Sequence, residues 1–199
     1  MKIFIISDTH FNHENIKKFE GRPDDFNEQI IKNCNKAISP NDLLIHLGDV
    51  IFGMDKEKNL PAIIHSIPGK KILCRGNHDG YKTSKWGDWK WFMQSGFDTV
   101  VDYFIYENIS FSHAPLTPLP MQGLKNYNSP VELNIHGHFH RGHTRLPQKE
   151  QDKETFTDEF YNYKYYNTFK EKYHLIQIED TFAPVLLDDI LKEKNIQLK

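Results

Sequence analysis

The sequence has little cysteine and no long hydrophobic run. Its 199 residues include only two cysteines, Cys34 and Cys74, which cannot form the disulfide framework of a small secreted domain and fit a reducing compartment. No apolar stretch approaches the roughly 20 residues of a membrane span. The apolar run after Met1 is too short for a secretory signal. We therefore expect a cytoplasmic protein without membrane contacts.

No charge of one sign dominates the chain either. It carries 25 Lys and Arg against 27 Asp and Glu, a formal net charge of −2. Proteins that bind a nucleic-acid backbone need several basic contacts, so the composition does not indicate such a partner, although a local basic groove stays open. The length and the hydrophobic fraction of 38% predict a single domain over residues 1–199 with a sizeable core.

Short apolar runs alternate with helical patterns in the first half of the chain, and strands follow one another later. Strands are expected at 2–7, 43–47, 71–74, 99–106, 108–112, 131–135 and 173–179. Helices are expected at 14–19, 25–38, 54–67, 82–95 and 187–194. This order predicts a mixed α/β layered domain.

Two aromatic segments each allow two interpretations. Residues 141–172 are polar and aromatic, and we expect an insertion or peripheral segment there. Its aromatic residues between 156 and 173 favour a packed amphipathic helix, with a lid, a protein contact or base stacking as alternatives. Trp86, Trp89 and Trp91 favour a core-facing helix over a nucleobase platform.

Five of the apolar runs end on side chains that bind metal ions. These side chains are Asp8, His10, Asp49, Asn77, His113, His138 and His140. Open α/β sheets build their sites at the carboxyl ends of strands. Imidazole, carboxylate and amide ligands suit Mn, Fe, Zn or Ni better than an all-oxygen Mg or Ca cage, and no thiolate is present for a structural zinc finger. The pattern predicts a metal-dependent hydrolase.

The order of these motifs resembles that of the calcineurin-like metallophosphoesterases. The matching motifs are Asp8-x-His10, Gly48-Asp49, Gly76-Asn77-His78-Asp79, His113 and Gly137-His138-Phe139-His140. The resemblance implies two mixed β-sheets packed as a sandwich and flanked by helices. It also implies two divalent ions, with Mn preferred. One ion would be held by Asp8, His10, Asp49 and His140, and the other by Asn77, His113, His138 and a bridging Asp49.

The resemblance further implies hydrolysis of a phosphodiester or phosphomonoester, which we expect to be of nucleotide type. A hydroxide shared by the two ions would attack phosphorus. His78 would bind phosphate or protonate the leaving group, steered by Asp79. Asn77, Arg75 and His13 are further candidate substrate contacts, although Arg75 and His13 are equally compatible with solvated surface residues.

The chain departs from the protein phosphatases of this superfamily. They carry Asp-Arg-Gly soon after Gly-Asp, where this chain has Val50-Ile51-Phe52-Gly53, so it resembles the small bacterial and phage members without a cap domain. A nuclease acting on DNA or RNA is an alternative function. A non-catalytic protein-binding scaffold with the same fold is another. His46 and His136 are interpreted as buried neighbours of the ligands rather than as further ligands.

Overall fold

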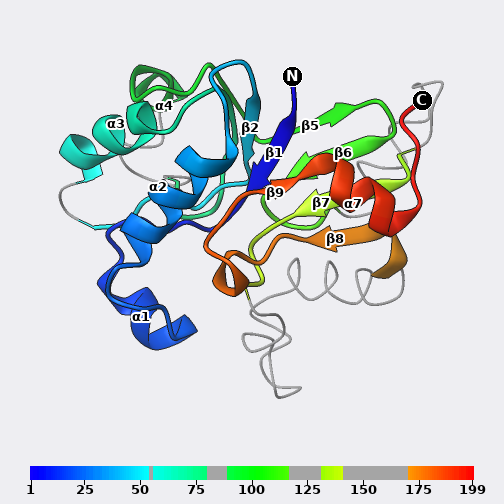
Figure 1. Ribbon diagram of the computed structural model, residues 1–199. Helices are drawn as coiled ribbons and strands as arrows, with labels where there is room; N and C mark the ends of the chain where they lie inside the picture. Colours follow the sequence, from blue (N-terminus) through cyan, green and yellow to red (C-terminus); the bar gives the residue numbers. More distant parts are fainter. Residues whose placement is uncertain (54–55, 80–88, 117–130, 141–169) are drawn as a thin grey trace, which may run out of the picture.

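Two β-sheets pack against each other in the computed structural model, which describes residues 1–53, 56–79, 89–116, 131–140 and 170–199 (Figure 1). The first sheet has the order β4-β3-β2-β1-β9: β4 Thr99–Val101, β3 Lys70–Cys74, β2 Leu43–His46, β1 Ile3–Ile6 and β9 Val185–Leu186. The second has the order β5-β6-β7-β8: β5 Tyr103–Tyr106, β6 Ile109–Ser112, β7 Leu133–His136 and β8 Tyr173–Leu175. The expected sandwich is confirmed.

Helices flank the sandwich on both sides (Figure 1). They are α1 Glu14–Glu20, α2 Phe26–Ala37, α3 Lys56–Ser66, α4 Trp89–Gln94 and α7 Leu187–Lys194, with 3₁₀ turns η3 Lys170–Lys172 and η4 Ile178–Asp180. Helix α1 ends at Gly21, whose φ of 65° is the left-handed geometry that glycine adopts readily. Within the described ranges, no helix combines the length and apolar character needed to cross a bilayer.

Both faces of the first sheet are buried. In β1, Phe4 and Ile6 face a core shared with helices α2, α3 and α4, whereas Ile5 faces a second core shared with the other sheet and α7. Strands buried on both faces are apolar at successive positions rather than at alternate ones. This packing explains the continuous apolar runs of the sequence.

Two of the expected strands are wrong in extent. The run 99–106 divides at Asp102, because β4 pairs with β3 in the first sheet while β5 pairs with β6 in the second. The run 173–179 leaves the sheet after Leu175 and ends in η4. Of the two aromatic segments, Trp86 and residues 141–169 lie outside the described residues. Trp91 packs on the first core as expected, but the core-facing expectation is wrong for Trp89, which is 45% exposed.

We expect the first core to depend strongly on Phe26. This side chain of α2 is 1% exposed, whereas Phe19 of α1 is 64% exposed. Phe26→Ala should lower the free energy of unfolding by about 3–5 kcal/mol, and Phe19→Ala should change it by no more than about 0.5 kcal/mol. Urea unfolding of both variants measures the difference. Equal losses in the two variants would contradict this assignment of the core.

Candidate metal centre

Parallel pairing brings all the predicted ligand motifs to one edge of the sandwich. In the first sheet, the last residue of β1, Ile6, pairs with the last residue of β2, His46, which pairs in turn with Leu73 of β3. In the second sheet, Ser112 at the end of β6 pairs with His136 at the end of β7. Each predicted ligand lies within four residues of one of these strand ends, so residues far apart in sequence converge there.

Asp49 lies at the centre of the converging side chains. Its Oδ2 is 3.6 Å from Nε2 of His10 on one side and 3.5 Å from Nε2 of His113 on the other. Its Oδ1 accepts a hydrogen bond of 2.8 Å from the backbone N–H of His78. One carboxylate oxygen therefore faces ligand atoms from both predicted sets.

The ring of His113 is oriented by the backbone. Its Nδ1 donates to the carbonyl of Leu47 at 2.7 Å, so Nε2 is the nitrogen aimed into the site. That Nε2 lies 2.9 Å from Oδ1 of Asn77 and 3.1 Å from Nδ1 of His138. When His113 is neutral, its Nε2, the Asn77 oxygen and the Asp49 oxygen all present lone pairs to one another. A proton or a metal ion must lie among them.

A second group consists of Asp8, His10 and His140. Their ligand atoms lie within 4.8 Å of one another, and Nε2 of His140 is 3.7 Å from Oδ1 of Asp8. Oδ1 of Asp8 and both ring nitrogens of His10 are buried and have no hydrogen-bond partner among the described residues. Buried polar atoms are rarely left in this state unless an ion or water serves them. The donor set therefore fits a divalent cation.

The electrostatics of the site also favour a cation. Burial, together with the nearby carboxylates of Asp79 and Asp8, raises the pKa of Asp49 to about 7 against the pull of His113. Burial lowers the pKa of His10 to about 2 and that of His138 to about 4. Both imidazoles are therefore neutral at pH 7, which is the form that binds metals.

The backbone is strained at the predicted ligands themselves. Five of them have left-handed φ angles: Asp8 at 51°, His10 at 45°, Asp49 at 54°, His138 at 72° and His140 at 48°. Such conformations persist where the surrounding structure enforces them, and they concentrate at functional sites.

Two motif glycines are needed for close approach to the carboxylates. A Cβ at Gly76 would lie 2.1 Å from Oδ1 of Asp49. A Cβ at Gly137 would lie 1.8 Å from Oγ of Ser7 and 2.3 Å from Oδ2 of Asp8. Each glycine thus allows one loop to close over the carboxylate carried by another loop.

The predicted substrate residues fall into different surroundings. His78 is half-buried, with its ring centroid 5.5 Å from that of His10, and Asn77 is exposed at the same edge. His13 lies 5.3 Å from His10, measured between ring centroids. Arg75 is paired with Asp102 at 2.5 Å and lies 5.0 Å over the ring of Trp89. A phosphate clamp by Arg75 would therefore compete with Asp102.

Asp79 joins two of the ligand loops. Its buried carboxylate accepts hydrogen bonds from the backbone N–H groups of Asp49, Val50 and Gly76 at 2.8–3.0 Å. These contacts fasten the Gly-Asp loop to the Gly-Asn-His loop. The hydrogen bonds described for the Asp79 carboxylate all come from backbone N–H groups, and none comes from the ring of His78. The steering of His78 by Asp79 therefore stays a prediction.

His46 links the two loops that follow β1 and β2 through hydrogen bonds. Its Nδ1 accepts the backbone N–H of Gly48, and its Nε2 donates to Oγ1 of Thr9 at 2.9 Å. The Thr9 hydroxyl in turn donates to the carbonyl of Val50. His136 is fully buried and its Nδ1 donates to the carbonyl of Gly137. Both histidines therefore occupy the supporting positions expected for them.

Three residues of the site carry no recognisable signal in the sequence. Arg22 and Glu179 form a fully buried ion pair beside His140, although 157 residues separate them. Phe52 lies at the rim, with its ring 4.2 Å from that of His13 and 5.5 Å from that of His78. No spacing rule joins positions so distant, and a lone phenylalanine after Gly-Asp resembles an ordinary core residue.

The comparisons with known proteins agree with this geometry. The sequence profile described as calcineurin-like phosphoesterase matches residues 1–198, so the chain belongs to that family. The family is one of metal-dependent phosphoesterases.

Two similar proteins carry no assigned activity of their own. A crystal structure of a protein of unknown function from Aquifex aeolicus has a TM-score of 0.65 and 26% identity, covering 96% of this chain and 98% of that one. An uncharacterised protein of Methanocaldococcus jannaschii is 39% identical over 84 residues, which are 40% of this chain and 48% of that protein. The chain thus spans about half the length of this curated relative.

We expect the Asp49 carboxylate to destabilise the metal-free protein above neutral pH. Because its folded pKa is raised from 3.8 to about 7, its contribution to stability is lost as pH rises through that interval. Without metal at pH 8, Asp49→Asn should therefore be at least as stable as the wild type. Mn²⁺ at about 100 times its Kd should stabilise the wild type by about 2.7 kcal/mol and leave Asp49→Asn unchanged. Thermal unfolding with EDTA or Mn²⁺ measures both effects. An equal gain in the two proteins would contradict the assignment.

Proposed function

We propose that this chain hydrolyses a phosphodiester or phosphomonoester of nucleotide type with two divalent ions, Mn²⁺ being preferred. The observation that carries this proposal is the position of the Asp49 Oδ2, which lies between Nε2 of His10 and Nε2 of His113. A carboxylate oxygen flanked by ligands from two sets is what a shared, charge-neutralising bridge requires.

Each ion has a full set of candidate ligands. The first set is Asp8, His10, Asp49 and His140, and the second is Asp49, Asn77, His113 and His138. When bound, divalent ions at such a site supply an acidified water and positive charge beside the phosphoryl oxygens. The protein itself keeps the imidazoles of His10 and His138 neutral, holds the carboxylates in place and limits the access of bulk water through burial.

His78 is assigned to the substrate. Its backbone N–H is anchored on Asp49, which sets the place of the residue relative to the ligands. Its half-buried ring lies 5.5 Å from that of His10 and next in sequence to the exposed Asn77. From there the imidazole can bind a phosphoryl oxygen or protonate a leaving group, and such acid catalysis contributes roughly 10²–10⁴-fold to the rate.

His78→Ala should keep the bound metal and lower kcat on a phosphodiester substrate by about 10²-fold or more. His65→Ala is a matched control, because His65 is an exposed helical histidine that donates a hydrogen bond to the carbonyl of Pro61. Metal content by elemental analysis and the rate on bis-p-nitrophenyl phosphate with Mn²⁺ give the two readouts. A normal rate in His78→Ala would reject the assigned role.

An exposed aromatic side chain at the rim of the site favours a substrate that carries a flat group, such as a nucleobase. Phe52 is 38% exposed and stands beside both His13 and His78. The backbone N–H of Phe52 donates to the carbonyl of Phe11, so this ring is held next to the loop that carries His10. Aromatic side chains stack on nucleobases with about 1–3 kcal/mol per base.

Phe52→Leu should raise KM for a nucleotide ester by about five-fold or more, since stacking contributes about 1–3 kcal/mol, and should leave KM for a simple alkyl phosphate unchanged. Phe19→Leu, at an exposed aromatic position of α1, is the control. Steady-state kinetics with both substrates decide the question. An equal change in KM for the two substrates would exclude base stacking on this ring.

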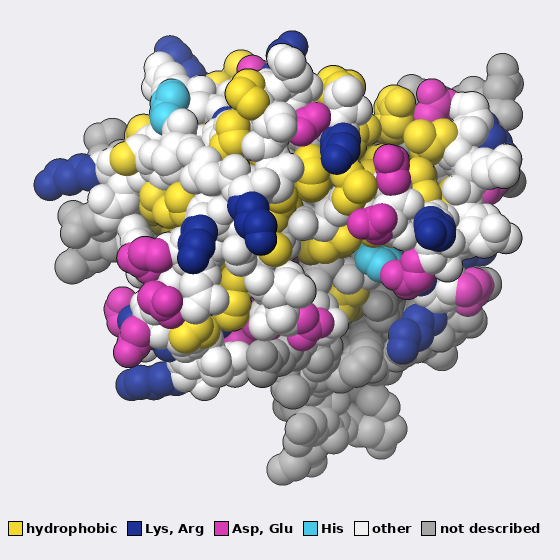
Figure 2. All heavy atoms as spheres, viewed as in Figure 1, with side chains coloured by type: hydrophobic (Ala, Val, Ile, Leu, Met, Phe, Trp, Pro, Cys, Tyr) yellow, Lys and Arg dark blue, Asp and Glu magenta, His cyan; other side chains and the backbone are white. Residues whose placement is uncertain are grey.

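The nuclease alternative gains no support from the face drawn in Figure 2. On the face drawn in Figure 2, Lys and Arg side chains are dispersed among Asp and Glu rather than gathered in a stripe. Backbone binding to nucleic acid depends on several such contacts and weakens steeply with salt. Activity that varies little with salt would favour a small substrate. Cys34 and Cys74 are both free, in keeping with the proposed cytoplasmic location.

A further inference from the structure

One carboxylate oxygen from the last quarter of the chain gathers three donors beside the metal ligands. Oε1 of Glu179, in η4, accepts hydrogen bonds from Nη2 of Arg22 at 2.5 Å, from Nε of Arg22 at 3.2 Å and from Nδ1 of His140 at 2.7 Å. The side chains of Arg22 and Glu179 are fully buried. A buried charge pair of this kind is costly to form and costly to break, so it requires an explanation.

The contact between Glu179 and His140 selects one form of the imidazole. A carboxylate can only accept, so the proton of His140 is placed on Nδ1 and the lone pair is left on Nε2. That Nε2 is the atom that faces Oδ1 of Asp8 at 3.7 Å. The neighbouring Gln177 donates to the backbone carbonyl of His140 at 2.8 Å. The segment containing Gln177 and Glu179 therefore fixes both the ring and the backbone of this ligand.

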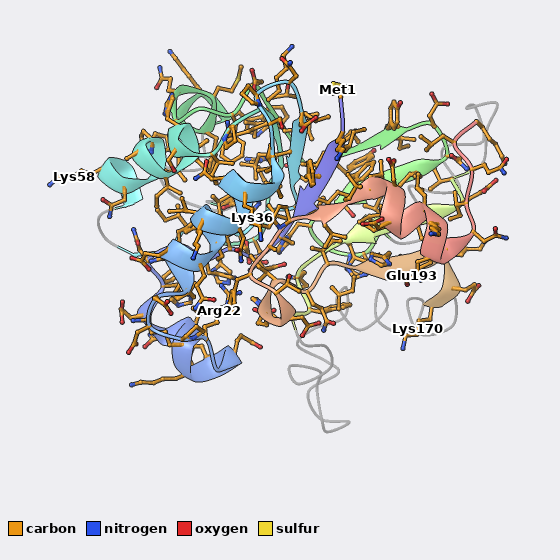
Figure 3. The ribbon with its side chains drawn as sticks, viewed as in Figure 1. Met1, Arg22, Lys36, Lys58, Lys170 and Glu193 are labelled. Atoms are coloured by element: carbon orange, nitrogen blue, oxygen red, sulfur yellow. The ribbon has the colours of Figure 1, made fainter. Side chains whose placement is uncertain are left out.

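Arg22 fixes the other side of the same site. Its Nη1 donates to the carbonyl of Thr9 and its Nη2 to that of Asp8, each at 2.7 Å. These carbonyls belong to the loop in which Asp8 and His10 adopt left-handed φ angles. Figure 3 places Arg22 in the loop between α1 and α2, whereas Lys58 projects away from the protein. A planar guanidinium can serve two carbonyls and a carboxylate together, which an ammonium group cannot.

The ion pair with Arg22 disfavours a third cation in the same neighbourhood. Glu20, His140 and Glu179 offer three potential ligand atoms within 4.8 Å of one another. However, Oε1 of Glu179 already holds the guanidinium of Arg22, and Nδ1 of His140 donates its proton to that oxygen. The positive charge required by this carboxylate is supplied by Arg22.

We propose that Arg22 and Glu179 are positioning residues that preorganise the Asp8, His10 and His140 metal site. Glu179 orients His140, and Arg22 links Glu179 to the strained loop of Asp8 and His10. The C-terminal segment is thereby part of the metal centre, although it supplies no ligand. This inference rests on the proposed function, because it assigns the two residues to the first of the two proposed ions.

The test is Mn²⁺ binding by the full chain, measured by calorimetry after removal of metal. Glu179→Gln should weaken one of the two binding events by 10–100-fold, the usual effect of losing a partner of a metal-bound histidine. Asp180→Asn makes the same chemical change at the exposed next residue of η4 and should leave the affinity unchanged. Ile190→Ala, in the second core, controls for lost stability.

A double-mutant cycle separates positioning from general stability. In a His140→Ala background, Glu179→Gln should cause a clearly smaller loss of affinity than in the wild type, because part of its effect passes through His140. Additive losses would overturn the inference. If Glu179→Gln does not fold, Arg22→Lys replaces it in the test. This variant keeps the positive charge but loses the paired hydrogen bonds of the guanidinium to the carbonyls of Asp8 and Thr9. Wild-type affinity in Arg22→Lys would overturn the inference.

The outcome for the wild type distinguishes this inference from the proposed function. A wild-type chain that takes up no Mn²⁺ would overturn the proposed two-ion function and the inference with it. A wild type that binds two ions beside a Glu179→Gln variant of unchanged affinity would overturn the positioning role alone.

Discussion

The burial of Asp49 next to Asp8 and Asp79 is the constraint on which the site depends. Three carboxylates withdrawn from water repel one another and lose hydration, and burial raises the pKa of Asp49 to about 7. The protein offsets this cost in part with backbone N–H groups, which donate to all three carboxylates. The negative charge that remains on these carboxylates attracts a cation, as a metal site requires.

The conformation of the ligand loops is determined by their contacts with these carboxylates and with one another. Asp79 fastens the loops after β2 and β3, and Gly76 and Gly137 let neighbouring loops close over Asp49 and Asp8. The left-handed angles at five ligands show that the loops are strained. The two cores on either side of the first sheet provide the rigid support for this strain.

The ligand motifs were predictable because their pattern is local. Each short apolar run is followed within a few residues by a side chain suited to metal, and parallel strands bring such ends together. The sandwich followed from the family resemblance. The division of 99–106 was not predictable, because an apolar run has the same appearance whether it stays in one sheet or crosses to another at Asp102.

The sequence by itself determined the candidate ligands, their order and the family to which the chain belongs, because those properties lie in short motifs. Only the tertiary structure decided which side chains support them. The contact between Arg22 and Glu179 joins residues 157 positions apart, and the assignment of Asp79 to backbone N–H groups depends on how two loops meet. Hydrogen bonds of this kind are set by packing in three dimensions, and no periodicity of the chain records them.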